Sequence, residues 1–158
     1  MKLKITPQFP LHGNVTLPGD KSISHRAALF SALAQGTSRF ENFLDAGVTR
    51  AMLNALTQLG ISWGLDDKTL TVEGCGLNQW KIPNEPLDCR NSGTTLRTLA
   101  GALVGTNTPA VLDGSPGLRR RPMGRIVDPL RQMGALIYAA DGAAPLRIGK
   151  RLGRNPLA

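Results

Sequence analysis

The sequence predicts a mixed α/β (α+β) fold built from two copies of a βαβαββ unit, with the helices packed together in a shared core. Short stretches of alternating apolar residues, typical of strands, are interleaved with longer stretches whose apolar residues recur at helical spacing. This order of elements occurs twice, and residues 56–60 (LTQLG) match residues 130–134 (LRQMG) at an offset of 74. Neither unit can cover both faces of its own sheet, so we expect the units to pack helix against helix.

The composition fits a globular protein that binds an anionic partner. The 158 residues suffice for one domain with a hydrophobic core, and 41% of them are hydrophobic. The net charge is +8. Such an excess favours nucleic acid, an acidic membrane, or small phosphorylated and carboxylated substrates as partners. Composition alone leaves these three classes open.

Neither a metal site nor a membrane segment is expected. Cys75 and Cys89 lack the spacing of a metal-binding motif, and the two histidines are His12 and His25, which disfavours a zinc site. No apolar run approaches the ~20 residues of a membrane span, and the amino terminus lacks the apolar core of a signal peptide. We therefore expect a soluble, cytoplasmic protein with two reduced thiols.

The first unit is predicted to span residues 18–82, after strands within residues 1–17 that lead into it. Apolar spacing and the glycines that end helices place its elements. The expected helices lie at about 21–35 and 47–60, and the expected strands at 38–43, 61–63 and 70–72. The last two strands flank a turn and predict a hairpin.

The second unit is predicted to span residues 83–150, followed by a tail at 151–158. Asn91-Ser92-Gly93 is expected to open its first helix. Pro122 is expected at the first position of its second helix, since helices favour proline there. A buried strand is expected at 110–112, and hairpin strands at 136–138 and 146–148.

Residues 17–26 (LPGDKSISHR) predict the end of a strand, a tight turn and the start of a helix. Asp20 or Ser22 can cap this helix, whose free N–H groups favour an anion. Lys21 offers a point charge and Arg26 a planar fork that suits carboxylate or phosphate. Alone, the stretch fits an ordinary capped helix with two solvated cations. Two similar stretches follow, which favours an oxyanion site.

The second such stretch, residues 91–97 (NSGTTLR), places small polar residues and a glycine at a helix start, with Arg97 one turn later. Gly93 lets an oxyanion approach the backbone N–H groups closely. The lysine of a Walker loop is absent, so binding of a nucleoside triphosphate has little support. Alone, this stretch fits a capping motif.

The third stretch, residues 119–125 (RRRPMGR), follows the buried strand. Three consecutive arginines are compatible with a nucleic-acid patch. No aromatic residue lies among them, and aromatic residues make up 4% of the chain, so platforms for base stacking are scarce. We expect Arg121, which precedes Pro122, to point into the same pocket as the first two stretches, and the other two arginines to be solvated.

The three stretches, in this order, resemble the 5-enolpyruvylshikimate-3-phosphate (EPSP) synthase family, and the similarity runs through nearly all of residues 10–149. The resemblance implies an enolpyruvyl transferase fold and transfer of the enolpyruvyl group of phosphoenolpyruvate to the 5-hydroxyl of shikimate 3-phosphate. This reaction releases phosphate and belongs to the shikimate pathway of aromatic amino acid biosynthesis. The family uses no metal or organic cofactor.

The resemblance also implies roles for individual residues. Lys21 matches a lysine that touches both substrates, and Ser22 and Arg26 match residues that hold shikimate 3-phosphate. Gly93 and Arg121 match positions that bind phosphoenolpyruvate, and Gly93 would lie against the inhibitor glyphosate. The same wall would be lined by Asn91, Thr94 and Arg97. Two departures from the family pattern are Thr98, which leaves glyphosate sensitivity open, and His25, which we interpret as a neutral variation.

Family members are far longer than this chain, and their active site lies between two domains of three βαβαββ units each. The resemblance places residues 1–17 in the other domain and the catalytic acid and base beyond residue 158. This chain offers the carboxylates of Asp20, Asp45 and Asp128. None of them matches the catalytic acid or base of the family. We therefore expect half of a binding cleft, which works with a complementary carboxyl-terminal chain or fragment.

Two other functions stay open. One is the related enzyme that uses a UDP-linked amino sugar, which is disfavoured because that family typically has Lys-Asn where this chain has Lys21-Ser22. The other is a non-catalytic, basic nucleic-acid-binding module. Salt-dependent binding of single-stranded nucleic acid would favour the module, whereas tight binding of shikimate 3-phosphate would favour the transferase.

Overall fold

The first half of the chain forms one antiparallel sheet and two helices. The computed structural model describes residues 3–4, 10 and 12–151. The sheet has the order β1-β3-β2. Its elements are, in chain order, α1 (Lys21–Leu33), β1 (Gln35–Phe40), α2 (Gly47–Gln58), β2 (Ser62–Asp66) and β3 (Thr69–Cys75). As predicted, β2 and β3 form a hairpin.

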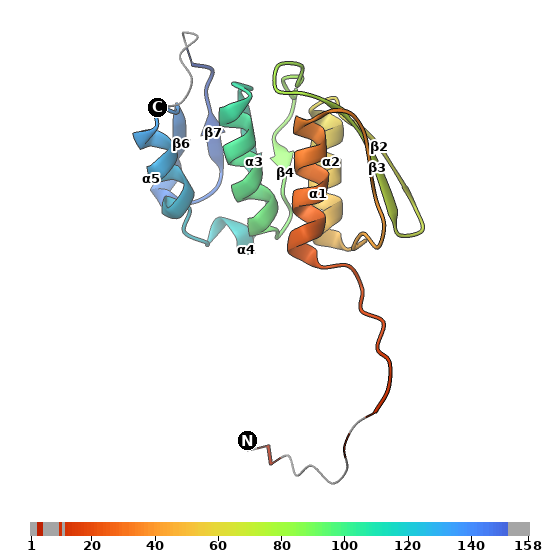
Figure 1. Ribbon diagram of the computed structural model, residues 1–158. Coiled ribbons are helices and arrows are strands. Elements are labelled where there is room, and N and C mark those ends of the chain that lie inside the picture. Colours follow the sequence, from red (N-terminus) through yellow and green to blue (C-terminus); the bar gives the residue numbers. More distant parts are fainter. Residues whose placement is uncertain (1–2, 5–9, 11, 152–158) are drawn as a thin grey trace.

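The second half forms a four-stranded sheet with the order β4-β5-β7-β6, in which β4 is parallel to β5. Its elements are β4 (Leu87–Asp88), α3 (Gly93–Gly105), β5 (Ala110–Asp113), α4 (Pro116–Arg119), α5 (Gly124–Gln132), β6 (Ile137–Ala139), the short 3-10 helix η1 (Ala140–Gly142) and β7 (Leu146–Ile148). Figure 1 shows α1, α2 and α3 side by side, with the β2–β3 hairpin flanking them on one side. The predicted mixed fold is confirmed.

The internal repeat is visible in the backbone. In each half the last strand pairs antiparallel with two earlier strands: β3 pairs with β1 and β2, and β7 pairs with β5 and β6. Strands β1, β2 and β3 therefore correspond to β5, β6 and β7. Gly60 and Gly134, which end α2 and α5, both have φ of 85°, a left-handed conformation that favours glycine. The following amides donate equivalent bonds, Ile61 N to Leu56 O at 3.0 Å and Ala135 N to Leu130 O at 2.9 Å.

The strand predicted just before α1 is absent. Residues 12–20 form no regular structure, and Val15 and Leu17 are 82% and 70% exposed. Figure 1 shows this segment leading away from the helices. A strand requires a neighbour for its N–H and C=O groups, and no described strand lies beside Val15. The first unit therefore lacks a counterpart of β4. The other residues of the predicted lead-in, and the tail beyond residue 151, lie largely outside the described residues.

Several element boundaries differ from the predictions. The strand predicted at residues 38–43 is β1 at Gln35–Phe40. The first helix ends at Leu33, and Gly36 lies within β1 instead of ending the helix. The helix predicted to begin at Pro122 begins at Gly124. A separate short helix, α4, precedes it because Ser115 caps that helix by accepting a bond from Leu118 N, and Pro116 occupies its first turn.

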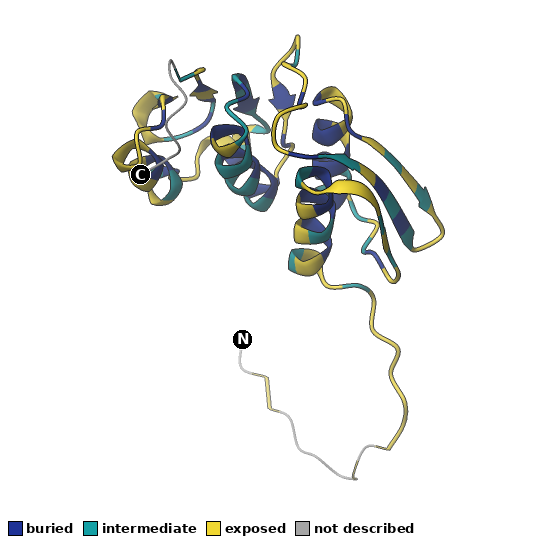
Figure 2. Ribbon diagram, turned by 45° about the horizontal axis from the view of Figure 1, so that its top comes forward, coloured by how far each residue is buried: buried dark blue, intermediate teal, exposed yellow. Residues whose placement is uncertain are grey.

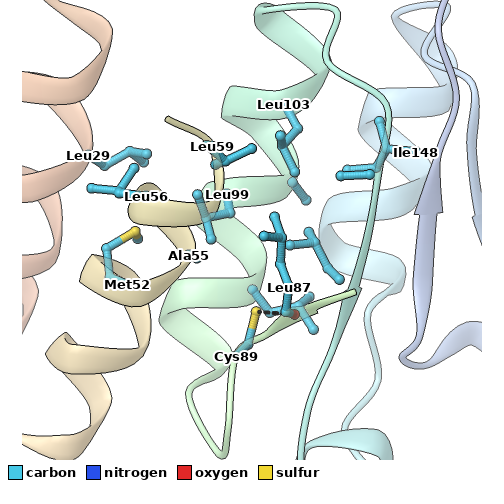
Figure 3. Close-up of a cluster of buried hydrophobic side chains, with 14 of the residues drawn as sticks. Leu29, Met52, Ala55, Leu56, Leu59, Leu87, Cys89, Leu99, Leu103 and Ile148 are labelled. Atoms are coloured by element: carbon cyan, nitrogen blue, oxygen red, sulfur yellow. Dashed lines mark hydrogen bonds between the residues drawn. The ribbon is translucent and has the colours of Figure 1, made fainter. Parts of the chain in front are cut away.

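Helices and strands of both halves share one hydrophobic core. Figure 2 shows buried residues gathered on the inward faces of the helices and strands, while the segment before α1 is exposed. In Figure 3, Leu56 of α2 and Leu87 of β4 lie on either side of Leu99 of α3, and all three side chains are fully buried. Cys89 is buried in the same cluster, and burial raises the pKa of its thiol to about 12. Both cysteines are free thiols.

An apolar groove remains open between α1, α3 and α5. It has a volume of about 510 Å³ and is lined by Phe30 and Leu33 of α1, Gly101 and Ala102 of α3, and Ile126 of α5, among others. Phe30 is 61% exposed.

Within residues 3–4, 10 and 12–151, no helix has the length and apolar character that crossing a membrane requires.

Candidate anion-binding site

The amino-terminal ends of α1, α2 and α3 lie at the same end of the molecule (Figure 1). The three helices run parallel because each is followed by a connection that returns the chain to this end. The partial positive charges of the helix starts therefore gather there. The predicted site residues of the first two stretches lie at two of these starts, on α1 and α3.

The start of α1 presents a lysine, a hydroxyl and an arginine. Asp20 caps the helix by accepting a bond from Ile23 N at 2.8 Å. It is one of the two residues that the sequence predicts as the cap. Lys21 is exposed, and its ammonium group has no hydrogen-bond partner among the described residues. Arg26 lies one turn later and donates from Nη1 to Ser22 O at 3.1 Å. This bond holds the guanidinium over the helix start and leaves its other N–H groups available.

The start of α3 is capped by Ser92, whose Oγ accepts a bond from Thr95 N at 3.1 Å. The backbone N–H groups of Gly93 and Thr94 have no acceptor within the described part of the chain. The Thr98 hydroxyl donates to the Thr94 carbonyl at 2.9 Å, so it is bonded within its own helix. Two amides at this helix start are therefore free to bind an anion.

Two guanidinium groups flank Gly93. A methyl group added at Gly93 would lie 2.7 Å from Arg97 Nη1 and 3.2 Å from Arg121 Nη1. Arg97 donates from Nη2 to Pro122 O at 3.1 Å, and Arg121 from Nη2 to Asn91 Oδ1 at 3.3 Å. Neither arginine forms an ion pair with a described carboxylate. Like charges this close repel unless an anion lies between them, so the pair is suited to a phosphate or carboxylate.

The three consecutive arginines have separate surroundings. Arg119 donates from Nε to Asp113 Oδ1 at 2.8 Å and forms a second bond to the other oxygen, and this contact lowers the pKa of the Asp113 carboxyl. Arg120 is exposed. Arg121 lies beside Gly93. The other two arginines are exposed to solvent, and Arg119 also forms an ion pair with Asp113.

His25 is the functional candidate that sequence reasoning missed. The sequence suggests only a neutral variation, but the side chain is 1% exposed and contacts three helices. Its Nδ1 lies 2.7 Å from Lys21 O, and its Nε2 lies 3.1 Å from Val48 O and 3.2 Å from Thr95 Oγ1. A histidine in a helix gives no sequence signal for such contacts, since its partners are 23 and 70 residues away.

The site supplies positive charge, and two of the three carboxylates considered from the sequence already have partners. Asp20 caps α1, and Asp45 binds Arg50, which lowers the pKa of the Asp45 carboxyl. A carboxyl with a lowered pKa is a poor general acid near neutral pH. Asp128 is exposed on α5. No group of three or more metal-ligating side chains occurs within residues 3–4, 10 and 12–151. The arrangement can therefore bind anions and hold them side by side.

Comparison with known proteins gives one consistent match. The model of the family "EPSP synthase (3-phosphoshikimate 1-carboxyvinyltransferase)" matches residues 5–156. The 3-phosphoshikimate 1-carboxyvinyltransferase of Salinibacter ruber is 50% identical over 139 residues, which cover 87% of this chain and 32% of the relative. The same enzyme of Acidithiobacillus ferrooxidans is 46% identical over 148 residues, or 93% of this chain and 34% of the relative.

Solved structures agree. The EPSP synthase of Acinetobacter baumannii superposes with a TM-score of 0.81 at 39% identity, covering 87% of this chain and 32% of that protein. This chain thus spans about one third of the length of the relatives that it matches.

Proposed function

Because the chain belongs to the EPSP synthase family, we propose that it is the substrate-binding part of a 3-phosphoshikimate 1-carboxyvinyltransferase. In this reaction the 5-hydroxyl of shikimate 3-phosphate attacks phosphoenolpyruvate, and phosphate leaves. Phosphoenolpyruvate carries one phosphate and one carboxylate group, and shikimate 3-phosphate also carries one of each. Catalysis therefore begins with bringing together two polyanions, which requires convergent cations.

The observation that carries this proposal is the pair of guanidinium groups of Arg97 and Arg121 beside Gly93. We assign phosphoenolpyruvate to this position. The free amides of α3 and the two guanidinium groups can bind its phosphate or carboxylate. Asn91 orients Arg121 through its Oδ1 and is itself held by a bond from Ser115 Oγ at 3.2 Å.

We assign shikimate 3-phosphate to the start of α1, with Lys21, Ser22 and Arg26 as its ligands. Lys21 belongs to the helix that is joined through His25 to the start of α3. This position supports a role of Lys21 in contacting both substrates. A lysine ammonium can donate to three acceptors at once, so it can neutralise groups of two neighbouring anions.

The chain supplies binding groups without a suitable acid and base, so we propose that it works with a further part of the protein. The methylene carbon of phosphoenolpyruvate must be protonated and the hydroxyl deprotonated. The relatives are about three times as long as their match to this chain. The open groove beside α1, α3 and α5 is where that further part would pack, because an apolar surface of this kind marks an interface.

The experiments below use two proteins. The remainder is the part of the Salinibacter ruber relative that lies beyond its match to this chain. The completed enzyme is this chain joined covalently to the remainder.

The nucleic-acid alternative has less support. Of the three consecutive arginines, Arg119 is ion-paired with Asp113 and Arg121 is bound to Asn91, so they do not form a continuous basic patch. Of the seven aromatic residues of the chain, Trp80 is buried, and the exposed Phe30 and Tyr138 lie on α1 and β6 and not among these arginines. A nucleic-acid module of this kind would need exposed stacking platforms next to its basic residues.

We expect shikimate 3-phosphate to bind the isolated 158-residue chain, and the Arg26→Ala variant to bind it about 10- to 150-fold more weakly. The loss corresponds to roughly 1.5–3 kcal/mol for a hydrogen bond to a charged group. Isothermal titration calorimetry measures both affinities. The Arg39→Ala variant, which removes an exposed arginine from β1, is the control and should bind like the unmodified chain. Equal affinities of the Arg26 and Arg39 variants would remove the assignment.

The Gly93→Ala substitution is expected to raise the KM for phosphoenolpyruvate about tenfold in the completed enzyme. The added methyl group would lie 2.7 Å from Arg97 Nη1, so that guanidinium must move out of its position. The KM for shikimate 3-phosphate should change less than twofold. Gly47→Ala is a matched control, because Gly47 also begins a helix and a methyl group there meets no atom within 4 Å. An unchanged KM for phosphoenolpyruvate would contradict the assigned position.

A further inference from the structure

We propose that His25 is a positioning residue that fixes the separation of the two substrate positions. The inference rests on the proposed function, because it concerns how the start of α1 and the start of α3 are held relative to each other. His25 itself lies beneath both starts and is 1% exposed. It therefore acts through Lys21 and through the residues that begin α3.

One side of the ring binds α1. Nδ1 lies 2.7 Å from Lys21 O, the carbonyl one turn earlier in the same helix, which is within hydrogen-bond distance. The bond runs from His25 back to the first residue of the helix. The backbone of Lys21 is therefore held by the ring as well as by the ordinary helical bonds.

The other side of the ring binds α2 and α3. Nε2 lies 3.1 Å from Val48 O, 3.2 Å from Thr95 Oγ1 and 3.4 Å from Ser92 Oγ. The Thr95 hydroxyl also donates to Val48 O at 3.2 Å, so the ring and this hydroxyl meet at the same carbonyl. Thr95 Oγ1 also lies 2.8 Å from Ser92 Oγ. One imidazole thus joins the first turns of three helices.

This network ends at the residues that form the phosphoenolpyruvate position. Ser92 caps α3 through Thr95 N, and Gly93 is the next residue. Loss of the ring would let the start of α3, with its cap and its free amides, move relative to the Lys21 backbone. Buried polar groups that lose their partner are costly to leave unpaired, so the surrounding helices would rearrange when the ring is removed.

Transfer between two bound substrates depends strongly on their separation. Each substrate can bind through ligands on its own helix, whereas reaction requires the hydroxyl of one to reach the carbon of the other. A misplacement of 1 Å can cost about 100-fold in rate. Removal of His25 is therefore expected to lower kcat more than it lowers the affinity for either substrate alone.

The test compares kcat with the dissociation constant of each substrate in the completed enzyme. For His25→Ala we expect kcat to fall at least about tenfold, while each dissociation constant changes less than threefold. His25→Gln, which retains a donor and an acceptor on a more flexible side chain of similar reach, should recover part of kcat. Ser31→Ala is the matched control: Ser31 is a buried polar residue of α1 whose hydroxyl donates within the helix to Ala27 O at 2.7 Å. Its kcat should stay within twofold.

A second variant covers the case in which His25→Ala does not fold. Thr95→Val removes the hydroxyl that lies next to Nε2 and keeps the shape of the side chain. It should also lower kcat by a larger factor than it changes either dissociation constant. An unchanged kcat in His25→Ala or in Thr95→Val would overturn the positioning role, as would equal losses in kcat and in both affinities. Absence of turnover in the unmodified completed enzyme would instead remove the proposed function, and the positioning role with it.

Discussion

Replacing Lys21 by methionine is expected to lower kcat/KM of the completed enzyme by about 100- to 1,000-fold, the loss that follows removal of one preorganised donor from a developing anion. Lys21 is the first residue of α1, its ammonium group has no hydrogen-bond partner within the described part of the chain, and its carbonyl is tied through His25 to the start of α3. Methionine keeps much of the length of the side chain and removes the charge. Phosphate release at several concentrations of both substrates measures the effect.

The control for this substitution is Lys68→Met, which removes an exposed lysine from the turn between β2 and β3. Its kcat/KM should stay within twofold of the unmodified enzyme. The affinities for both substrates should fall in the Lys21 variant, because we assign this ammonium group to contacts with each of them. Turnover within threefold of the unmodified enzyme would exclude Lys21 from the site.

Replacing Phe30 by aspartate is expected to weaken association between this chain and the separately prepared remainder by at least about 100-fold. Phe30 lines the groove between α1, α3 and α5 and is 61% exposed. If the remainder covers the groove, association would bury the new carboxylate against apolar side chains, which is strongly unfavourable without a partner. In the isolated chain the side chain stays largely in water, so the free energy of unfolding should fall by no more than about 1–2 kcal/mol, from the lower helix propensity of aspartate and its charge near the carboxyl end of α1.

Tyr138→Asp is the matched control, because Tyr138 is a similarly exposed aromatic residue (59%) on β6, outside the groove. Analytical ultracentrifugation measures association, and thermal unfolding measures the stability of each isolated chain. Equal association by the Phe30 and Tyr138 variants would show that the remainder covers a different surface.

Some helix starts and ends could be predicted from the sequence because they depend on neighbouring residues, whereas the predicted end of α1 at Gly36 and the predicted start of α5 at Pro122 were wrong. Asp20 and Ser92 act as caps through bonds to amides three residues later, and Gly60 and Gly134 take the left-handed conformation that ends a helix. Strand pairing depends on residues far away in the chain. The stretch around Val15 alternates like a strand, but no strand among the described residues lies beside it to pair with it.

The candidate site likewise contains contacts that follow from neighbouring residues and contacts that depend on residues far apart in the chain. The positions of Gly93 and Arg97 follow from a spacing of four on one helix face, and the structure brings them together. Arg121 was expected at this pocket both from its position before Pro122 and from the resemblance to a known family, but its bond to Asn91 joins residues 30 apart and was not predicted. His25 was missed because its burial and its partners on α2 and α3 arise only when the helices pack.

The most direct test of the central claim, that this chain binds both substrates but lacks the groups for turnover, is phosphate release with and without the remainder. The isolated chain is mixed with shikimate 3-phosphate and phosphoenolpyruvate, and the release of phosphate is followed before and after the remainder is added as a separate protein. We expect no release above background from either part alone and sustained release from the mixture. Robust release by the 158-residue chain alone would contradict the claim, and so would a mixture that associates but stays inactive.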